Sequence, residues 1–203
     1  MNLVIVDYGI GNLRSLINAF EYIGIEDISI SSDLNVLDAA SKIILPGVGA
    51  FGDSIKKIDA LGLRDILIHH SLVKKKPILG VCLGMQLMAN RSEESKGSEG
   101  LGLIDADIVK LSASDKVPHV GFNQISPNKN NSIYSSFESQ PYDFYFTHSY
   151  GMQCEDQIGQ SYCDYAGGFI ASFQVNNIAG VQFHPELSQK NGLNLLRNFL
   201  ENR

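Results

Sequence analysis

Short, continuous apolar runs alternate with stretches of helical periodicity through the first half of the chain. The runs that we predict as strands lie at residues 3–6, 28–30, 42–46 and 77–81. The predicted helices are 13–23, a helical region from the glycine-rich turn after Pro46 to about Val73, and 83–89. Apolar strands of this kind, separated by helices, predict a parallel sheet that is covered on both faces.

The second half of the chain has a different pattern. Predicted strands at 104–111, 142–147, 168–175 and 179–183 are joined by turn-rich segments such as 126–131, and a helix with apolar residues from Leu193 to Leu200 follows. No internal repeat, linker or low-complexity block divides the sequence. We therefore expect a single α/β domain over residues 1–203, with a mostly parallel central sheet, helices on both faces and a more antiparallel C-terminal portion.

Composition and charge limit the kinds of protein and partner that fit this chain. Apolar residues make up 44% of the 203 residues and charged residues 19%, which is enough to form a sizeable core. The net charge of −6 argues against a nucleic-acid partner. No apolar run approaches the ~20 residues that span a bilayer, and no signal-peptide pattern is evident. Three cysteines are too few for a disulfide scaffold, so we expect a soluble, cytoplasmic protein without membrane contact.

The strongest candidate for chemistry is Cys82, in Gly80-Val81-Cys82-Leu83-Gly84. This is the thiol counterpart of the nucleophile elbow, in which the nucleophile sits on a sharp turn from strand to helix. Glycines two positions to either side remove Cβ atoms that would collide at such a turn. The N-terminus of the following helix favours a thiolate, and the N–H of Leu83 is placed to bind an oxyanion. An ordinary buried thiol is the alternative.

His184 is the candidate base for that thiol, because it ends an apolar strand in Phe183-His184-Pro185-Glu186. Proline favours extended geometry in the residue before it. In an extended segment residues i and i+2 face the same way, so the Glu186 carboxylate can orient the imidazole. A simple turn at the end of a strand is the alternative, but the order Cys–His–Glu makes a triad the better interpretation.

The other histidines and cysteines carry weaker signals. His69 and His70 precede three lysines and are interpreted as a solvated surface pair, whereas His119 and His148 fit packing and hydrogen bonding. Cys154 and Cys163 lie in a turn-rich region without clustered histidines. We therefore expect no metal and no cofactor.

Gly47-Val48-Gly49-Ala50-Phe51-Gly52 matches the glycine fingerprint of dinucleotide-binding folds. Pro46 interposes, however, and the acidic residue expected some 20 positions later to hold a ribose is missing. A better use of the turn Gly47–Gly49 is to present flexible backbone N–H groups to the thiol, where they complete an oxyanion hole with the amide of Leu83.

Taken together, these residues resemble the class I glutamine amidotransferases, and most closely the glutaminase subunits of histidine biosynthesis. The resemblance covers nearly the whole chain and rests on the segments 7–13, 45–52, 80–87, 92–94, 100–104, 117–119, 145–150 and 180–186. It implies a flavodoxin-like fold and hydrolysis of L-glutamine through a thioester on Cys82, with His184 as general base and acid and Glu186 orienting it. It also implies Val48 and Leu83 as oxyanion donors and the following residues as glutamine-binding: Gly49, Gln86, Glu94, Ser149 and Tyr150.

The same resemblance implies a partner, a (β/α)8-barrel cyclase that receives the ammonia and makes imidazole glycerol phosphate and an aminoimidazole carboxamide ribotide. It further implies slow glutaminase activity until the turn at 46–49 reorients in the complex. Phe122 departs from the family, which usually has a tryptophan at this cyclase-contacting position. A paralogue that feeds ammonia to a different synthase, such as one that amidinates a surface sugar, therefore stays open. A related cysteine hydrolase, such as a peptidase or deglycase, is a further alternative, but Glu94 and Gln86 favour glutamine over its substrates. A catalytically silent partner or nucleotide-binding module is disfavoured, because Cys82, His184 and Glu186 are all present.

Overall fold

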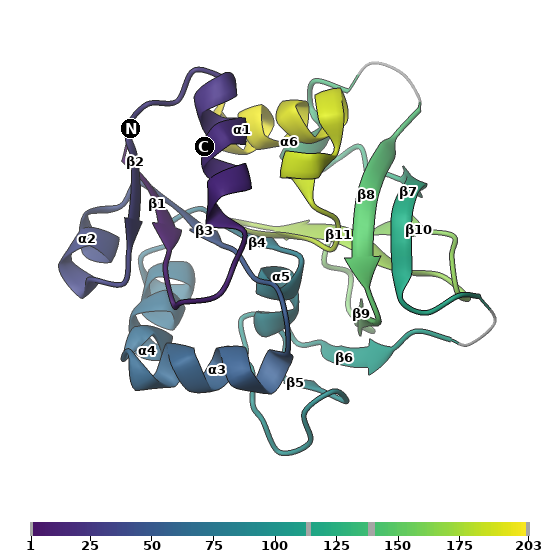
Figure 1. The fold of residues 1–203 in the computed structure, drawn as a ribbon, viewed down its shortest axis with the longest axis horizontal. Helices are drawn as coiled ribbons and strands as arrows, with labels where there is room; N and C mark the ends of the chain where they lie inside the picture. The colour runs from purple at the N-terminus through teal and green to yellow at the C-terminus, as the bar shows by residue number, and fades with distance from the viewer. Residues whose placement is uncertain (1, 113–114, 138–140, 202–203) are drawn as a thin grey trace.

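The computed structural model describes residues 2–112, 115–137 and 141–201 (Figure 1). The α-helices are α1 Leu13–Tyr22, α2 Leu34–Ala39, α3 Phe51–Ala60, α4 Leu63–Ile68, α5 Leu83–Leu87 and α6 Gln189–Glu201. The strands are β1 Leu3–Val6, β2 Ile28–Ser31, β3 Lys42–Leu45, β4 Ile78–Val81, β5 Arg91–Ser92, β6 Asp107–Lys110, β7 His119–Ser126, β8 Asp143–His148, β9 Tyr150–Gln153, β10 Ser161–Cys163, β11 Phe169–Val175 and β12 Ile178–Val181. Shorter helical turns are η1 His69–Val73, η2 Ser132–Tyr134 and η3 Pro185–Leu187.

The main sheet has the strand order β2-β1-β3-β4-β12-β11-β10-β7-β8. The pairs from β2 to β12 are parallel, and the pairs from β12 onward are antiparallel. Strand β9 branches from β11 and carries β6 and β5. The predicted α/β fold is confirmed, including the change from parallel to antiparallel pairing in the second half.

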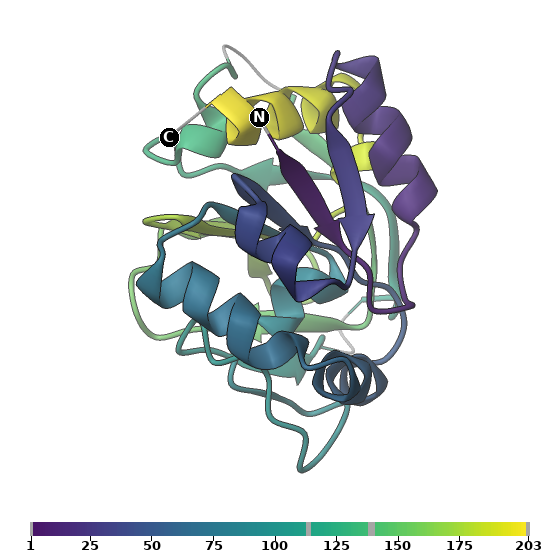
Figure 2. The same ribbon diagram turned by 90° about the vertical axis from the view of Figure 1, so that its left-hand side faces the viewer.

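Helices cover both faces of the parallel part, with α1 and α6 on one face and α3, α4 and α5 on the other (Figures 1 and 2). Alternate residues of β1 explain why both faces are apolar. Leu3 and Ile5 pack toward α1 and α6, whereas Val4 and Val6 pack toward α2, α3 and α4. A strand buried on both sides reads as a continuous apolar run, which is why the sequence predicted these strands well.

The antiparallel part was predicted less completely. Strands β7, β9 and β10 were not expected there, and neither were helix α2 in the parallel half and the two-residue strand β5. Strand β7 pairs with β8 from His119 opposite His148 to Gln124 opposite Asp143. Half of its residues face outward, and its first residues follow Pro118, so its stabilisation comes from pairing with β8 and β10 rather than from an apolar run.

Three glycines permit the close crossing between β4, α5 and the end of β3. A Cβ added at Gly84 would lie 1.8 Å from the carbonyl oxygen of Leu45, and one at Gly80 would lie 2.7 Å from the N of Met85. A Cβ at Gly47 would lie 2.8 Å from the N of Gly84. These contacts confirm that glycines on either side of Cys82 remove collisions.

Among the described residues, none of the helices combines the length and apolar character that crossing a membrane requires.

Replacing Gly84 tests this crossing. Gly84→Ala is expected to lower the free energy of unfolding by at least about 3 kcal/mol, because the Leu45 backbone must move to admit the methyl group. Gly62→Ala is the control: Gly62 has φ +68 but open space around it, so the substitution costs about 1–2 kcal/mol of backbone strain. Urea unfolding of both variants measures the difference, and equal losses would contradict the close-crossing explanation.

Candidate active site

Cys82 occupies the turn between β4 and α5 with φ 53° and ψ −111°, a backbone conformation that residues other than glycine rarely adopt. Its N–H donates to Val181 O at 2.8 Å, which extends the pairing of β4 with β12. Its carbonyl accepts from the N–H groups of Met85 and Gln86, which begins α5. The strand and the helix are therefore both anchored at Cys82, and the strained residue is held by regular structure on each side.

His184 and Glu186 lie next to this turn. The Nδ1 of His184 is 2.8 Å from Oε1 of Glu186, and both side chains are buried. We expected an extended segment to bring the two together. Instead, His184 is extended and the 3₁₀ turn η3 begins at Pro185, so the turn folds the carboxylate back onto the ring. The predicted contact is present, but the predicted reason for it is wrong.

The charge state of His184 follows from two opposing effects. Burial lowers the pKa of its imidazole, but contacts with Cys82 and Glu186 outweigh burial and raise it well above its ordinary value. The Nε2 atom has no hydrogen-bond partner among the described residues, and Cys82 is the group that contributes most to the raised pKa. With Nδ1 held by Glu186, a protonated ring directs its other N–H toward the sulfur.

A cavity of about 310 Å³ opens beside Cys82. It is lined by Val48, Gly49, Cys82, Leu83, Gln86, Glu94, Pro118, Thr147, His148, Ser149, Tyr150 and His184. Every residue predicted for the site lines this cavity except Glu186, which contacts His184 from behind. Pro118, Thr147 and His148 were not predicted. Pro118 precedes β7, a strand that the sequence did not predict, and Thr147 and His148 are the last residues of β8.

The glycine-rich turn after β3 is held at both ends. The Tyr8 hydroxyl donates to Pro46 O at 2.6 Å before the turn, and the Glu94 carboxylate accepts from Phe51 N at 2.7 Å after it. Between these anchors Val48 is exposed to the cavity side and Gly49 has φ +89. Gly52 has a packing role, because a Cβ there would lie 2.7 Å from Ser95 Oγ. Packing thus accounts for a glycine that had suggested a nucleotide fingerprint.

Gln182 is a buried side chain of the site that the sequence analysis did not single out. Its Nε2 lies 3.8 Å from the sulfur of Cys82, and its Oε1 accepts from Gln86 Nε2 at 3.0 Å. A signal was present in the sequence: Gln182 precedes His184 by two residues, and alternate residues of a strand face the same side.

His148 and His119 form a hydrogen-bonded pair beside the cavity. Nδ1 of His148 donates to Tyr150 O at 2.8 Å, so its Nε2 accepts from Nδ1 of His119 at 3.2 Å. Burial lowers the pKa of His148 to about 4, with smaller lowering contributions from His119 and His184. The packing and hydrogen-bonding role expected for these two histidines fits this arrangement, and His148 also faces the cavity.

The interpretation of His69 and His70 as a solvated pair is wrong for His70, which is 1% exposed. It lies in the π-helical turn η1, and its Nε2 is 3.7 Å from Oδ1 of Asp38. Cys154 and Cys163 are free and lie outside the cavity beside Cys82. In the parts of the chain that the structure describes, no group of histidine, cysteine and acidic side chains could hold a metal ion.

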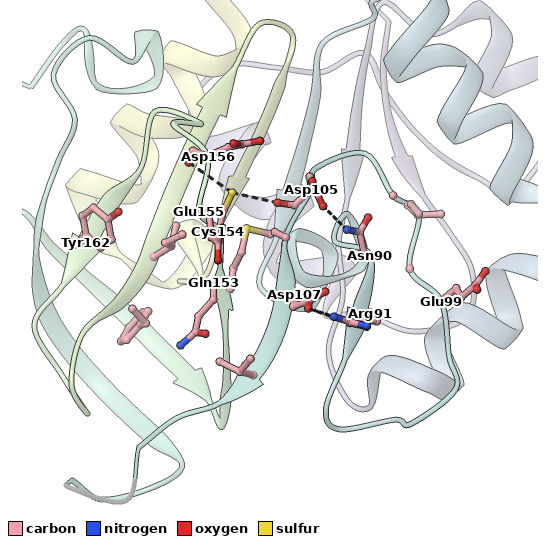
Figure 3. A pocket seen from close by; sticks show the side chains of 18 of the residues that line it. Asn90, Arg91, Glu99, Asp105, Asp107, Gln153, Cys154, Glu155, Asp156 and Tyr162 are labelled. Atoms are coloured by element: carbon pink, nitrogen blue, oxygen red, sulfur yellow. Dashed lines mark hydrogen bonds and ion pairs between the residues drawn. The ribbon is translucent and has the colours of Figure 1, made fainter.

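A larger cavity, of about 1150 Å³, contains none of the predicted site residues. Figure 3 shows that several of its polar side chains pair with neighbouring groups. Arg91 binds Asp107, Asn90 binds Asp105, and the sulfur of Cys154 contacts the carbonyl oxygens of Asp105 and Asp156. Burial raises the pKa of the Cys154 thiol in the larger cavity, whereas the smaller cavity contains Cys82 together with His184. The candidate active site is therefore the smaller cavity.

Comparisons with known proteins agree with this geometry. The sequence model of the family described as "Glutamine amidotransferase class-I" matches residues 4–202. The imidazole glycerol phosphate synthase subunit HisH 2 of Vibrio vulnificus is 41% identical over 203 residues, covering 99% of this chain and 94% of that protein. The protein of the same name from Nitrobacter winogradskyi is 44% identical over 209 residues, covering 98% and 97%. A solved structure described as a glutamine amidotransferase has a TM-score of 0.76 at 17% identity, covering 98% of this chain and 97% of that one.

The buried His148 predicts how stability depends on pH. Its pKa is about 4 in the folded chain and 6.5 when unfolded, so the unfolded state binds more protons between these values. Stability therefore falls as the pH falls, by about 2 kcal/mol between about pH 7.5 and pH 5 from this residue. Urea unfolding across that range measures the slope. His148→Gln should remove the part of this pH dependence that His148 contributes and keep the part that His119 contributes. A slope of unfolding free energy against pH that is unchanged in the variant would contradict the lowered pKa of His148.

Proposed function

The chain belongs to the class I glutamine amidotransferase family, and from this premise we propose that it is the glutaminase subunit of an imidazole glycerol phosphate synthase. The observation that carries the proposal is the convergence of Cys82, His184 and Glu186 at a cavity whose lining matches the residues predicted for glutamine. The relatives' names point to the synthase, and the geometry of the site supports the chemistry.

The thiolate of Cys82 attacks the side-chain amide carbon of glutamine, and the carbonyl oxygen becomes an oxyanion. The N–H groups of Leu83, at the start of α5, and of Val48 stabilise that charge. The proton held by His184 passes to the nitrogen, which leaves as ammonia, and a thioester remains on Cys82. His184, now neutral, takes a proton from water, and the hydroxide formed releases glutamate. The reaction consumes one glutamine and one water and yields glutamate and ammonia.

Glu186 acts through His184, because it accepts the Nδ1 proton and fixes which ring nitrogen faces the sulfur. The glutamine-binding roles fall to the other cavity residues. Glu94 uses one oxygen for Phe51 N and offers its carboxylate to the substrate α-amino group. Gln86 donates both amide protons within the protein, to Tyr150 O and Gln182 Oε1, so its oxygen is the atom left for substrate. Gly49, Ser149 and Tyr150 line the remaining wall.

The partner in this proposal is a (β/α)8-barrel cyclase that accepts the ammonia. The surface offered for docking is the edge formed by β7 and β8, where the rings of Phe122 and Tyr145 stack edge to face at 5.5 Å. Phe122 is 50% exposed and Val120, two residues earlier on β7, is 58% exposed, so this edge offers neighbouring apolar side chains that a partner can cover. A partner at this edge keeps ammonia away from water, where protonation would end its nucleophilicity.

Labelling with a glutamine-mimicking diazo-ketone tests the site. We expect a covalent adduct on Cys82, mapped by mass spectrometry, with Cys154 and Cys163 unmodified. Cys82→Ala should leave the free energy of unfolding within about 1 kcal/mol and abolish glutamine hydrolysis, while added ammonium salts still sustain the cyclase reaction. An adduct on another residue, or glutaminase activity in Cys82→Ala, would contradict the assignment of Cys82 as the nucleophile.

A second candidate function is ammonia supply to a different synthase, and Phe122 in place of the family's tryptophan favours it. Adding an imidazole glycerol phosphate synthase cyclase with its nucleotide substrate separates the two candidates. Under the main proposal, glutaminase turnover rises at least about ten-fold, because the partner completes the oxyanion hole. No rise with this cyclase, combined with diazo-ketone labelling of Cys82, would instead support another acceptor. Phe122→Trp is the matched variant for cyclase affinity.

A further inference from the structure

Gln182 is placed beside Cys82 by the pairing of two parallel strands. The register sets Val181 of β12 opposite Val81 of β4, so the next residues, Gln182 and Cys82, are also neighbours. The pairing of β4 with β12 continues past the strand ends, since Cys82 N donates to Val181 O at 2.8 Å, and Gln182 N donates to Ala171 O of the neighbouring β11 at 2.8 Å. The backbone therefore fixes Gln182 at the level of the sulfur, with no exposed surface.

The orientation of the Gln182 amide follows from one unambiguous acceptor. The carbonyl oxygen of Tyr150 can only accept, so the group of Gln86 that meets it at 2.9 Å is its NH₂. The second proton of that NH₂ points to Gln182 at 3.0 Å, and Gln182 must present its oxygen there. The NH₂ of Gln182 is consequently the end that faces Cys82 Sγ, at 3.8 Å.

The groups around the Cys82 sulfur decide whether the thiol or the thiolate is favoured, and this N–H is one of them. The carbonyl oxygen of Thr147 lies 4.0 Å from Sγ, and it favours the protonated thiol because it accepts S–H and repels a thiolate. The titratable side chains around the sulfur are His184 with Glu186 behind it, Tyr8, and the cavity residues His148 and Glu94. A hydrogen-bond donor beside the sulfur opposes the effect of the Thr147 carbonyl, because a bond from a neutral N–H strengthens when its acceptor becomes charged. The N–H of Gln182 is such a donor.

We propose that Gln182 donates a hydrogen bond to the Cys82 sulfur that stabilises the thiolate, and that Gln86 holds the Gln182 amide in the orientation this requires. Gln182 is then a positioning and charge-stabilising residue, and the sulfur has a second donor besides His184. This inference rests on Cys82 being the nucleophile of the proposed function. It assigns Gln86 a second role, because one amide both orients Gln182 and faces the substrate.

The test measures the rate at which iodoacetamide alkylates Cys82 as a function of pH, followed on the Cys82 peptide by mass spectrometry. Gln182→Met keeps the length of the side chain and removes the donor. We expect alkylation about ten-fold slower at neutral pH, with rates that converge at alkaline pH, where the sulfur is ionised in both proteins. A merely structural role would leave the midpoint of the pH profile in place. An unchanged midpoint in Gln182→Met would overturn the proposal.

Gln174→Met is the matched control, because Gln174 is a partly buried amide of the neighbouring β11 that contacts Ile133 N and Ser132 Oγ instead of Cys82. Its midpoint should equal that of the parent chain, and an equal shift in both variants would count against a specific bond. Alkylation uses no glutamine, so a missing shift contradicts only the role of Gln182. Absent glutamine turnover, by contrast, contradicts only the proposed function.

A second measurement needs no substitution at Gln182. The side-chain amide proton signals of Gln182, observed by NMR in the parent chain, should move as the pH is raised through the ionisation of Cys82. In Cys82→Ala the same signals should stay constant over that range. Signals that are constant in the parent chain, or that titrate equally in Cys82→Ala, would contradict a bond between the amide and the sulfur.

Discussion

The backbone at Cys82 is the constraint on which the rest of the site depends. A left-handed residue between β4 and α5 aims the side chain out of the end of the sheet, and it is stable only because its neighbours over-determine it. Val181 holds its N–H, α5 begins on its carbonyl, and Gly84 lets the helix touch the Leu45 carbonyl at the end of β3. A side chain at Gly84 would push α5 away from β3, and the first N–H groups of the helix would then leave the sulfur.

The chemistry is assembled where neighbouring parallel strands end at one edge. The turn at 46–49 follows β3, Cys82 follows β4, and Gln182 and His184 follow β12, which are adjacent in the sheet. Polar groups at such an edge are held by main-chain geometry, so their relative positions tolerate little variation. Strands β8 and β9 then close the cavity from the antiparallel side with His148, Ser149 and Tyr150.

Hydrogen bonding connects these parts into one network. The carbonyl oxygen of Tyr150 accepts from both Gln86 and His148, which ties the helix α5 to the pair of histidines on β7 and β8. Because each bond fixes the donor and acceptor ends of the next group, the orientation of the amides and imidazoles near the sulfur is set by backbone carbonyls. The same network reaches His119 on β7, the strand that carries the exposed Phe122.

The sequence by itself determined the parallel half of the fold, because strands buried on both faces and helices with one apolar face leave patterns of fixed period. It also identified Cys82 and His184, since glycine and proline restrict the backbone locally around each. Only the tertiary structure decided what lies beside them. The turn η3 that brings Glu186 to His184 is local, but the pattern of residues did not predict it. Strand β7, the burial of His70 and the contact of Gln182 with the sulfur depend on segments distant in sequence. Such contacts arise from register and packing between elements, which no local pattern of residues encodes.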